Sequence, residues 1–146
     1  MISQDDITSF SLAEYSFLRD DYGFKGPKIK KESWSTQIDY LKDEIAVEIN
    51  LDFRDFVVDL FIVRLEDGKL PKGYYVSAGR KLRIFLLNIL ADKSWPVDEA
   101  LLINLRTKTN RADRDSTHFK KRLYQYRLVL TSFMDKILEQ GTDLFN

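Results

Sequence analysis

Alternation between apolar and polar side chains over residues 45–63 constrains the fold more than any other feature of this sequence. Ile45, Val47, Ile49 and Leu51 share one parity, while Glu44, Glu48, Asn50 and Asp52 share the other. A period of two places the apolar set on one face of an extended chain and predicts a half-buried antiparallel strand. Residues 56–63 are apolar on both faces apart from Asp59. This second pattern predicts a strand that is central or covered on both sides.

The same alternation extends toward the N-terminus. Trp34, Thr36, Ile38 and Tyr40 share one parity, and Lys42-Asp43 can form a tight turn before the next strand. The stretch 27–32 is a candidate for a further strand. The sequence therefore predicts an antiparallel meander of three to four strands.

Helical spacing of apolar residues flanks this meander on both sides. We expect one helix over 5–20, ended by the turn that contains Gly23 and Gly26-Pro27. Three more are expected after Gly68: from Ser77 to Leu90, from Pro96 onward, and from Asp115 or Ser116 to Gly141. The predicted class is α+β, a single domain over 1–146 with an N-terminal helix, the meander, and three C-terminal helices packed on the sheet.

Composition excludes several kinds of chemistry. The chain has no Cys and a single His, which excludes disulfides, thiol nucleophiles, Cys-ligated metals and His-rich metal sites. The N-terminus lacks the pattern of a secretory signal, and no apolar run approaches the ~20 residues of a membrane span. We expect a cytoplasmic protein with no cofactor, no metal and no membrane contact.

Charge is balanced over the whole chain, with 23 basic and 23 acidic residues, but not along it. Residues 1–67 carry net −7, to which the meander contributes Glu44, Glu48, Asp52 and Asp55. These carboxylates predict an acidic surface for a basic partner. The alternative is the ordinary solvent side of a half-buried sheet. Acid–base catalysis is disfavoured because no second catalytic group stands at a fixed spacing. Asp59, in an apolar strand, is expected to form a structural ion pair if it is buried.

A basic run lies in the second half of the chain. Residues 106–122 carry net +5, from seven basic and two acidic side chains. The basic residues are Arg106, Lys108, Arg111, Arg114, Lys120, Lys121 and Arg122. Such a run can bind phosphates and predicts, as the alternative function, a nucleic-acid-associated protein. Against this interpretation, the pI of the whole chain is about 6.6 and no known nucleic-acid-binding motif is present.

The N-terminal half also resembles a known group of proteins. The resemblance rests on a short helix leading into Asp21-Tyr22-Gly23-Phe24, a strand containing Trp34, and the stretch 45–59. This layout, over residues 5–66, resembles small bacterial α+β immunity proteins of polymorphic or contact-dependent toxin systems. The resemblance implies a non-enzymatic binder that occludes the active site of a cognate toxin. The meander carboxylates would be its surface, with Trp34, Tyr40 or Phe53 as aromatic anchors.

Overall fold

A computed structural model describes residues 3–72, 76–77, 80–108, 110, 112 and 114–146. Its centre is a five-stranded antiparallel sheet in the order β1-β2-β3-β4-β7. The strands are β1 (Lys25–Lys31), β2 (Ser35–Lys42), β3 (Ile45–Asp52), β4 (Val57–Arg64) and β7 (Arg83–Phe85). The predicted α+β class and the four-stranded meander are confirmed. The fifth strand, β7, was not predicted.

The alternating pattern does place the apolar residues of β3 on one face. Neighbouring strands pair Ile38 with Ile49 and Ile49 with Leu60, so the buried side chains align across the sheet. The main core lies on this face, against the helices. A smaller apolar cluster lies on the opposite face and contains Leu41, Ala46, Phe61, Val63 and Leu65. Both faces of β4 are therefore covered near Phe61, as its sequence predicts.

The N-terminal helix is shorter than predicted. Helix α1 (Gln4–Glu14) begins at Ser3, whose hydroxyl accepts a hydrogen bond from the amide of Asp6 at 3.2 Å. It ends at Tyr15, and a separate turn of helix, α2 (Phe17–Asp20), follows. The ring of Tyr15 is fully buried and its hydroxyl donates to the carbonyl of Leu123 at 2.8 Å.

The predicted helix over 77–90 is wrong in its first part, and only residues 86–90 of its described part are helical. Residues 76–77 form β5 (Val76–Ser77), which pairs with β6 (Arg80–Lys81), and helix α3 (Leu86–Asp92) begins only after β7. The apolar stripe that suggested one helix is divided because Ile84 pairs with Ile62 of β4 and Phe85 with Phe61. Sheet pairing thus outweighs the local helical period for residues 83–85.

The other two C-terminal helices are confirmed with small changes. Helix α4 (Glu99–Arg106) begins after Asp98, whose carboxylate accepts from the amide of Ala100, and not at Pro96. Helix α5 (Ser116–Gln140) is capped by Asp115 and ends at Gly141, where φ is +52°. A short 3₁₀ helix, η2 (Gly141–Phe145), follows.

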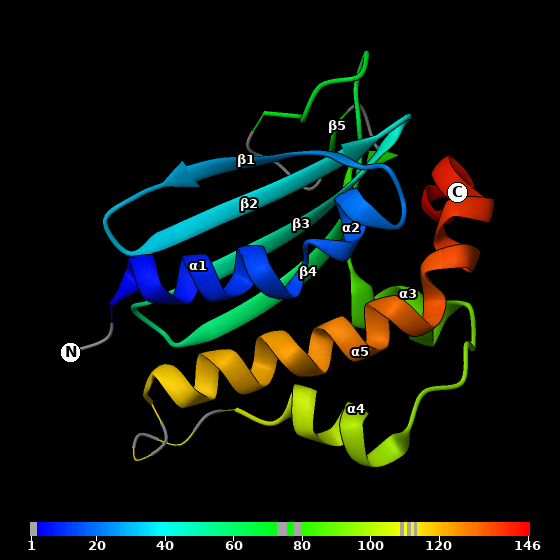
Figure 1. The fold of residues 1–146 in the computed structure, drawn as a ribbon. Helices are drawn as coiled ribbons and strands as arrows, with labels where there is room; N and C mark the ends of the chain where they lie inside the picture. Colours follow the sequence, from blue (N-terminus) through cyan, green and yellow to red (C-terminus); the bar gives the residue numbers. More distant parts are fainter. Residues whose placement is uncertain (1–2, 73–75, 78–79, 109, 111, 113) are drawn as a thin grey trace.

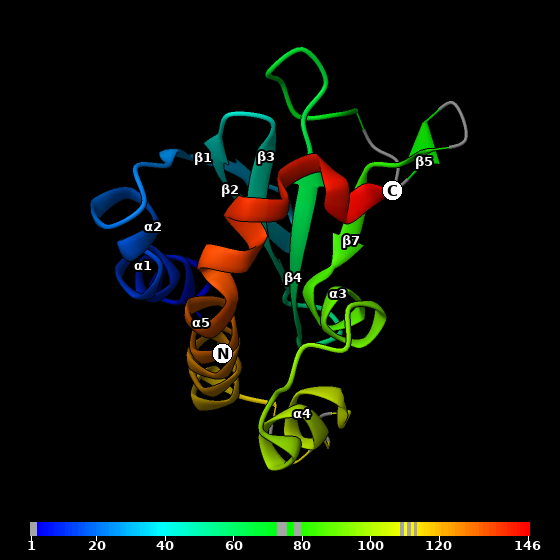
Figure 2. The same ribbon diagram turned by 90° about the vertical axis from the view of Figure 1, so that its right-hand side faces the viewer.

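The helices lie on one side of the sheet. Helices α1 and α5 run side by side across it, and α4 packs against α5 farther from the strands (Figure 1). Figure 2 shows the same layers from the end, with β7 and α3 beyond β4. None of the helices in the described part of the chain is both long enough and apolar enough to cross a membrane.

Candidate functional site

The structure does not bring the four predicted carboxylates into one surface. Glu44 lies exposed in the turn between β2 and β3, whereas Asp52 is the last residue of β3 and Asp55 lies in the turn that follows it. These turns are at opposite ends of β3, about 27 Å apart at ~3.4 Å per residue. One oxygen of Asp52 accepts the amides of Arg54 and Asp55, both at 2.9 Å, so this carboxylate shapes the turn.

Glu48 is buried, which corrects its predicted place on an exposed acidic face. It is 3% exposed, and its carboxylate lies 3.1 Å from Nε of Arg83. Arg83 also donates to the carbonyl of Pro71 at 3.1 Å. Burial, and then the hydrogen bond with the neighbouring Asp39, raise the pKa of Glu48 to about 8. The outer face of the sheet is therefore covered here by the chain that follows β4.

Of the three predicted aromatic anchors, only Trp34 is exposed. Its side chain is 61% accessible in the turn between β1 and β2. Tyr40 is buried in the main core, and Phe53 packs against Phe119 with 5.1 Å between ring centroids. Tyr40 and Phe53 are therefore core residues and cannot anchor a partner in this conformation.

Asp59 is half-buried, and no Lys, Arg or His of the described residues lies within 4.0 Å of its carboxylate. The expected ion pair is thus not formed within that part of the chain. Burial, and next the charge of Asp52, raise the pKa of Asp59. Because the carboxylate of Asp59 is only half-buried, it keeps partial contact with water and does not need the ion pair that full burial would require.

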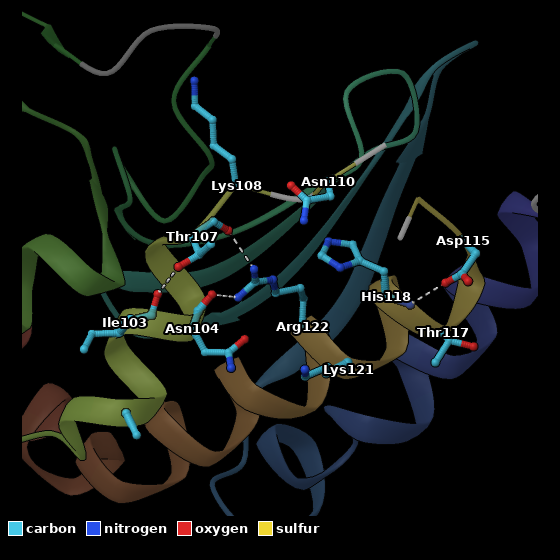
Figure 3. A pocket seen from close by; sticks show the side chains of 11 residues that line it. Ile103, Asn104, Thr107, Lys108, Asn110, Asp115, Thr117, His118, Lys121 and Arg122 are labelled. Carbon is cyan, nitrogen blue, oxygen red and sulfur yellow. Dashed lines mark hydrogen bonds between the residues drawn. The ribbon is translucent and has the colours of Figure 1, made fainter. Parts of the chain in front are cut away.

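Three of the basic residues of 106–122 border a hollow between α4 and α5, which we call the helix hollow. It encloses about 520 Å³ and is lined by Asn104, Thr107, Lys108, His118, Lys121 and Arg122, among others (Figure 3). Asp115 accepts the backbone amide of His118 at 3.0 Å, which starts α5 beside this hollow. Arg111 lies outside the described residues.

Arg122 has a structural part in this arrangement. Its guanidinium donates to the carbonyl of Asn104, and to the carbonyl of Thr107 at 2.7 Å (Figure 3). These carbonyls belong to the last turn and the cap of α4, where a cation complements the helix dipole. Burial lowers the pKa of Arg122, but an arginine stays charged at neutral pH. Sequence reasoning counted this residue with the exposed cations because its helical position alone does not reveal α4 beside it.

The other described cations of the segment are exposed. Among the described residues, no carboxylate lies within 4.0 Å of Arg106, Lys108, Arg114 or Lys121. The guanidinium of Arg114 lies over the ring of Phe56, 5.7 Å from its centroid. This end of the molecule can therefore attract anionic groups.

Two further depressions adjoin the helix hollow. The first, the strand-edge groove, comprises two hollows of about 370 and 320 Å³ that share Asp59, Leu105, Arg106 and Tyr126. The second, the tryptophan hollow, encloses about 740 Å³ and includes Trp34, Phe53, Phe56, Arg114 and Lys120. Phe56 and Arg114 line both the groove and the tryptophan hollow, so the two adjoin.

Within the described ranges, no three His, Asp or Glu side chains are placed to hold a metal ion. The fold and its depressions define an α+β protein with a cationic, partly aromatic surface at one end of the sheet. The chain matches no protein-family model, and no curated protein or solved structure is significantly similar to it.

Proposed function

We propose that this protein is a non-enzymatic binding module for a protein partner, and that the partner contacts the end of the molecule around Trp34. The observation that carries the proposal is the exposed indole of Trp34 on a hollow that also includes Arg114 and Lys120. Tryptophan and arginine are the residues most enriched among those that dominate binding energy in protein interfaces.

The charge of this surface favours an acidic partner. The cations that line the depressions outnumber the carboxylates that line them, six to four. The cations are Arg106, Lys108, Arg114, Lys120, Lys121 and Arg122, and the carboxylates are Asp6, Asp55, Asp59 and Asp115. Glu48 is buried and Glu44 lies at the far end of the sheet. The basic partner expected from sequence would require a contiguous acidic surface, which the four predicted carboxylates do not form. Complementary charge would steer the encounter and set the orientation of the complex.

The resemblance of residues 5–66 to bacterial immunity proteins supports a more specific role. In that role the protein binds a cognate toxin and occludes its active site, with no reaction of its own. An end of the molecule that bears an exposed aromatic side chain and cations suits the blocking of an acidic active site. The toxin's active site is then expected to carry exposed carboxylates.

The test is affinity capture from the cells that produce the protein, after nuclease treatment, with three versions of the bait. Wild-type protein and Tyr124→Ala are expected to retain one stoichiometric protein, and Trp34→Ala is expected to lose it. Tyr124 is the matched control because it is an exposed aromatic residue, on α5, outside these depressions. Equal retention by all three baits, or no stoichiometric protein at all, would refute the proposal. Growth rescue from the captured partner's toxicity would establish the immunity role.

A nucleic-acid-binding function is the second candidate, favoured by the cations that line the helix hollow. Lys108 and Lys121 lie on it without a carboxylate neighbour among the described residues. We expect such a function to appear as salt-sensitive binding of labelled RNA or DNA that is lost in Lys108→Glu/Lys121→Glu. Unchanged binding by this variant, or none by the wild type, would eliminate the candidate.

A further inference from the structure

One edge of β4 is only half covered. Strand β7 pairs with Phe61, Ile62 and Val63, after which the chain turns into α3 at Leu86 (Figure 2). Along residues 57–60 this edge has no strand neighbour in the part of the chain that the structure describes. An unpaired edge of this kind is a template for an additional strand.

The direction of the backbone shows which groups are offered. The amide of Arg64 donates to the carbonyl of Leu82 on the β7 side. Because peptide groups alternate along a strand, the backbone groups of Val58 and Leu60 face the same side. Their side chains are buried in the main core, so only main chain is presented at this edge.

The strand-edge groove runs along these groups. Its lining includes residues 55–59 on one side and the end of α4, Leu105 to Lys108, on the other. Its second part continues past Leu60 to Phe85, the last residue of β7. The uncovered length of β4 is four residues, which is about 13 Å of strand. The groove is therefore open along the whole uncovered edge.

The charges that line the strand-edge groove favour one kind of extended segment over others. Arg106, Lys108 and Arg114 line the groove and face no carboxylate within 4.0 Å among the described residues. Asp55 and Asp59 are the acidic residues on its wall. An occupant with carboxylates at its C-terminal or outward positions would neutralise these cations.

We propose that the groove binds an extended acidic peptide segment of the partner, which pairs with the free edge of β4 as an added strand. This inference rests on the proposed protein-binding function and specifies its site and partner chemistry. Main-chain hydrogen bonds would supply affinity, and the cations would select for Asp and Glu. A peptide suits this groove better than a nucleic acid because its aromatic rings are already engaged: Tyr126 is buried, and Phe56 lies under Arg114.

The experiment begins with a displayed library of random twelve-residue peptides selected on the wild-type protein. We expect the enriched peptides to be rich in Asp and Glu. The best peptide is then synthesised in three forms: unmodified, and with alternate backbone amides N-methylated in each of the two registers. Methylation in the pairing register is expected to weaken binding at least tenfold, because it removes main-chain donors without altering the protein. The bound peptide should also slow hydrogen exchange at the amides of Val58 and Leu60.

Charge variants test the cations with a matched control. Arg106→Glu/Lys108→Glu should weaken peptide binding at least tenfold, and Lys69→Glu/Lys72→Glu, a pair of exposed lysines in the loop after β4, should not. Selection of no acidic peptide, insensitivity to methylation in both registers, or tighter binding of a twelve-nucleotide oligothymidine would each overturn the inference. If Arg106→Glu/Lys108→Glu still captures the cellular partner that Trp34→Ala loses, the strand-pairing inference fails while the proposed function stands.

Discussion

Glu48 shows how its surroundings change the chemistry of one side chain. On an isolated strand it would be an ordinary exposed carboxylate, and the alternation places it on the polar face. In the fold it lies beside Asp39 and Arg83, with Asp39 2% exposed. Gln37 donates to one oxygen of Asp39 at 2.8 Å, and the carboxyl of Glu48 is hydrogen-bonded with Asp39. Burial and the neighbouring carboxylate therefore favour the protonated form of Glu48, against the opposing charge of Arg83.

The first prediction concerns the pH dependence of stability. The pKa of Glu48 is about 8 in the folded protein against an ordinary value of 4.5. Between these values the folded protein holds a proton that the unfolded chain releases, so raising the pH lowers the free energy of unfolding, and the loss is complete above about pH 8. Glu48→Gln, which mimics the protonated form, should flatten this decline. Each pKa unit corresponds to about 1.4 kcal/mol. Denaturant unfolding at pH 5, 6.5 and 8 measures the effect, and parallel curves for both proteins would contradict it.

The second prediction concerns Arg122. Arg122→Leu removes the donors to the carbonyls of Asn104 and Thr107 and leaves the end of α4 without its cation. The expected loss of stability is about 1.5–3 kcal/mol, typical of hydrogen bonds to a charged group. Lys121→Leu is the control, because Lys121 is next to Arg122 in the chain but its side chain is exposed. This substitution should change the free energy of unfolding by less than ~0.5 kcal/mol. A similar melting temperature for both variants would show that Arg122 does not hold α4.

At the scale of the element, the two sheet edges are built differently. Strand β1 is an outer strand that carries Lys25, Lys28, Lys30 and Lys31, a proline, and a register shift between Lys25 and Lys28. Charged lysines, proline and bulges are the usual protections of an edge against pairing with other chains. Gly26 belongs to the same region, because its φ is +116° and a Cβ there would lie 2.7 Å from the carbonyl oxygen of Asp39. The uncovered part of β4 has none of the lysines that protect β1.

The third prediction follows from the protected edge. Lys28→Val/Lys30→Val removes two exposed charges from β1 and leaves an apolar outer strand beside Ile29, which is already 48% exposed. We expect concentration-dependent association, visible as larger species by light scattering, with little change in unfolding free energy. Lys69→Val/Lys72→Val makes the same change in composition in a loop and should stay monodisperse. Association of both variants alike would assign the effect to hydrophobicity alone.

The fourth prediction concerns the start of α5. Asp115→Ala removes the acceptor for the amide of His118 and should cost about 1 kcal/mol, within a usual range of ~0.5–2. Asp115→Asn keeps a capping oxygen and should retain most of that stability. Thermal unfolding of the three proteins measures the difference. If the Asn variant is as unstable as the Ala variant, the carboxylate charge and not the cap is what matters.

At the scale of the whole molecule, segments from distant parts of the chain meet at one end of the sheet. These are the β1–β2 turn, the β3–β4 turn and the start of α5 (Figure 1). Together with the end of α4 they line the helix hollow, the strand-edge groove and the tryptophan hollow. The opposite end carries Glu44 in the β2–β3 turn and a hollow of about 480 Å³ that is lined by Lys25, Lys28, Lys42 and Asp43, among others. Net charge is zero over the chain, so any steering of a partner arises from this distribution and not from the total.

The fifth prediction uses that distribution. Binding of the captured partner should weaken several-fold between 50 and 300 mM salt, because ions screen the cations over about 10 Å at 0.1 M. Trp34→Ala should bind more weakly at every salt concentration but with the same slope, since the indole carries no charge. Arg106→Glu should reduce the slope itself. Calorimetric titrations at four salt concentrations separate these effects, and a salt-independent affinity would exclude the electrostatic part of the proposal.

The sequence by itself determined the strands of the meander, the start and end of α5, and the α+β class. These features follow from local rules: period-two alternation, a capping Asp115, and a glycine at the helix end. It failed at residues 77–90, because pairing of Ile84 and Phe85 with β4 is a contact between segments more than 20 residues apart. No window of local sequence contains that information.

The tertiary structure alone decided which side chains remain available to a partner. The alternation along β3 correctly placed Glu48 on the face opposite the apolar residues. Its burial beside Arg83 depends on the chain that folds over that face of the sheet. Likewise Tyr40, Phe53 and Trp34 are aromatic residues of the same region, and only packing against the helices separates the two core residues from the exposed one. The basic residues of 106–122 were visible in the sequence, but α4 engages Arg122 and leaves its neighbours exposed. Burial depends on what covers a residue, and that is a property of contacts distant along the chain.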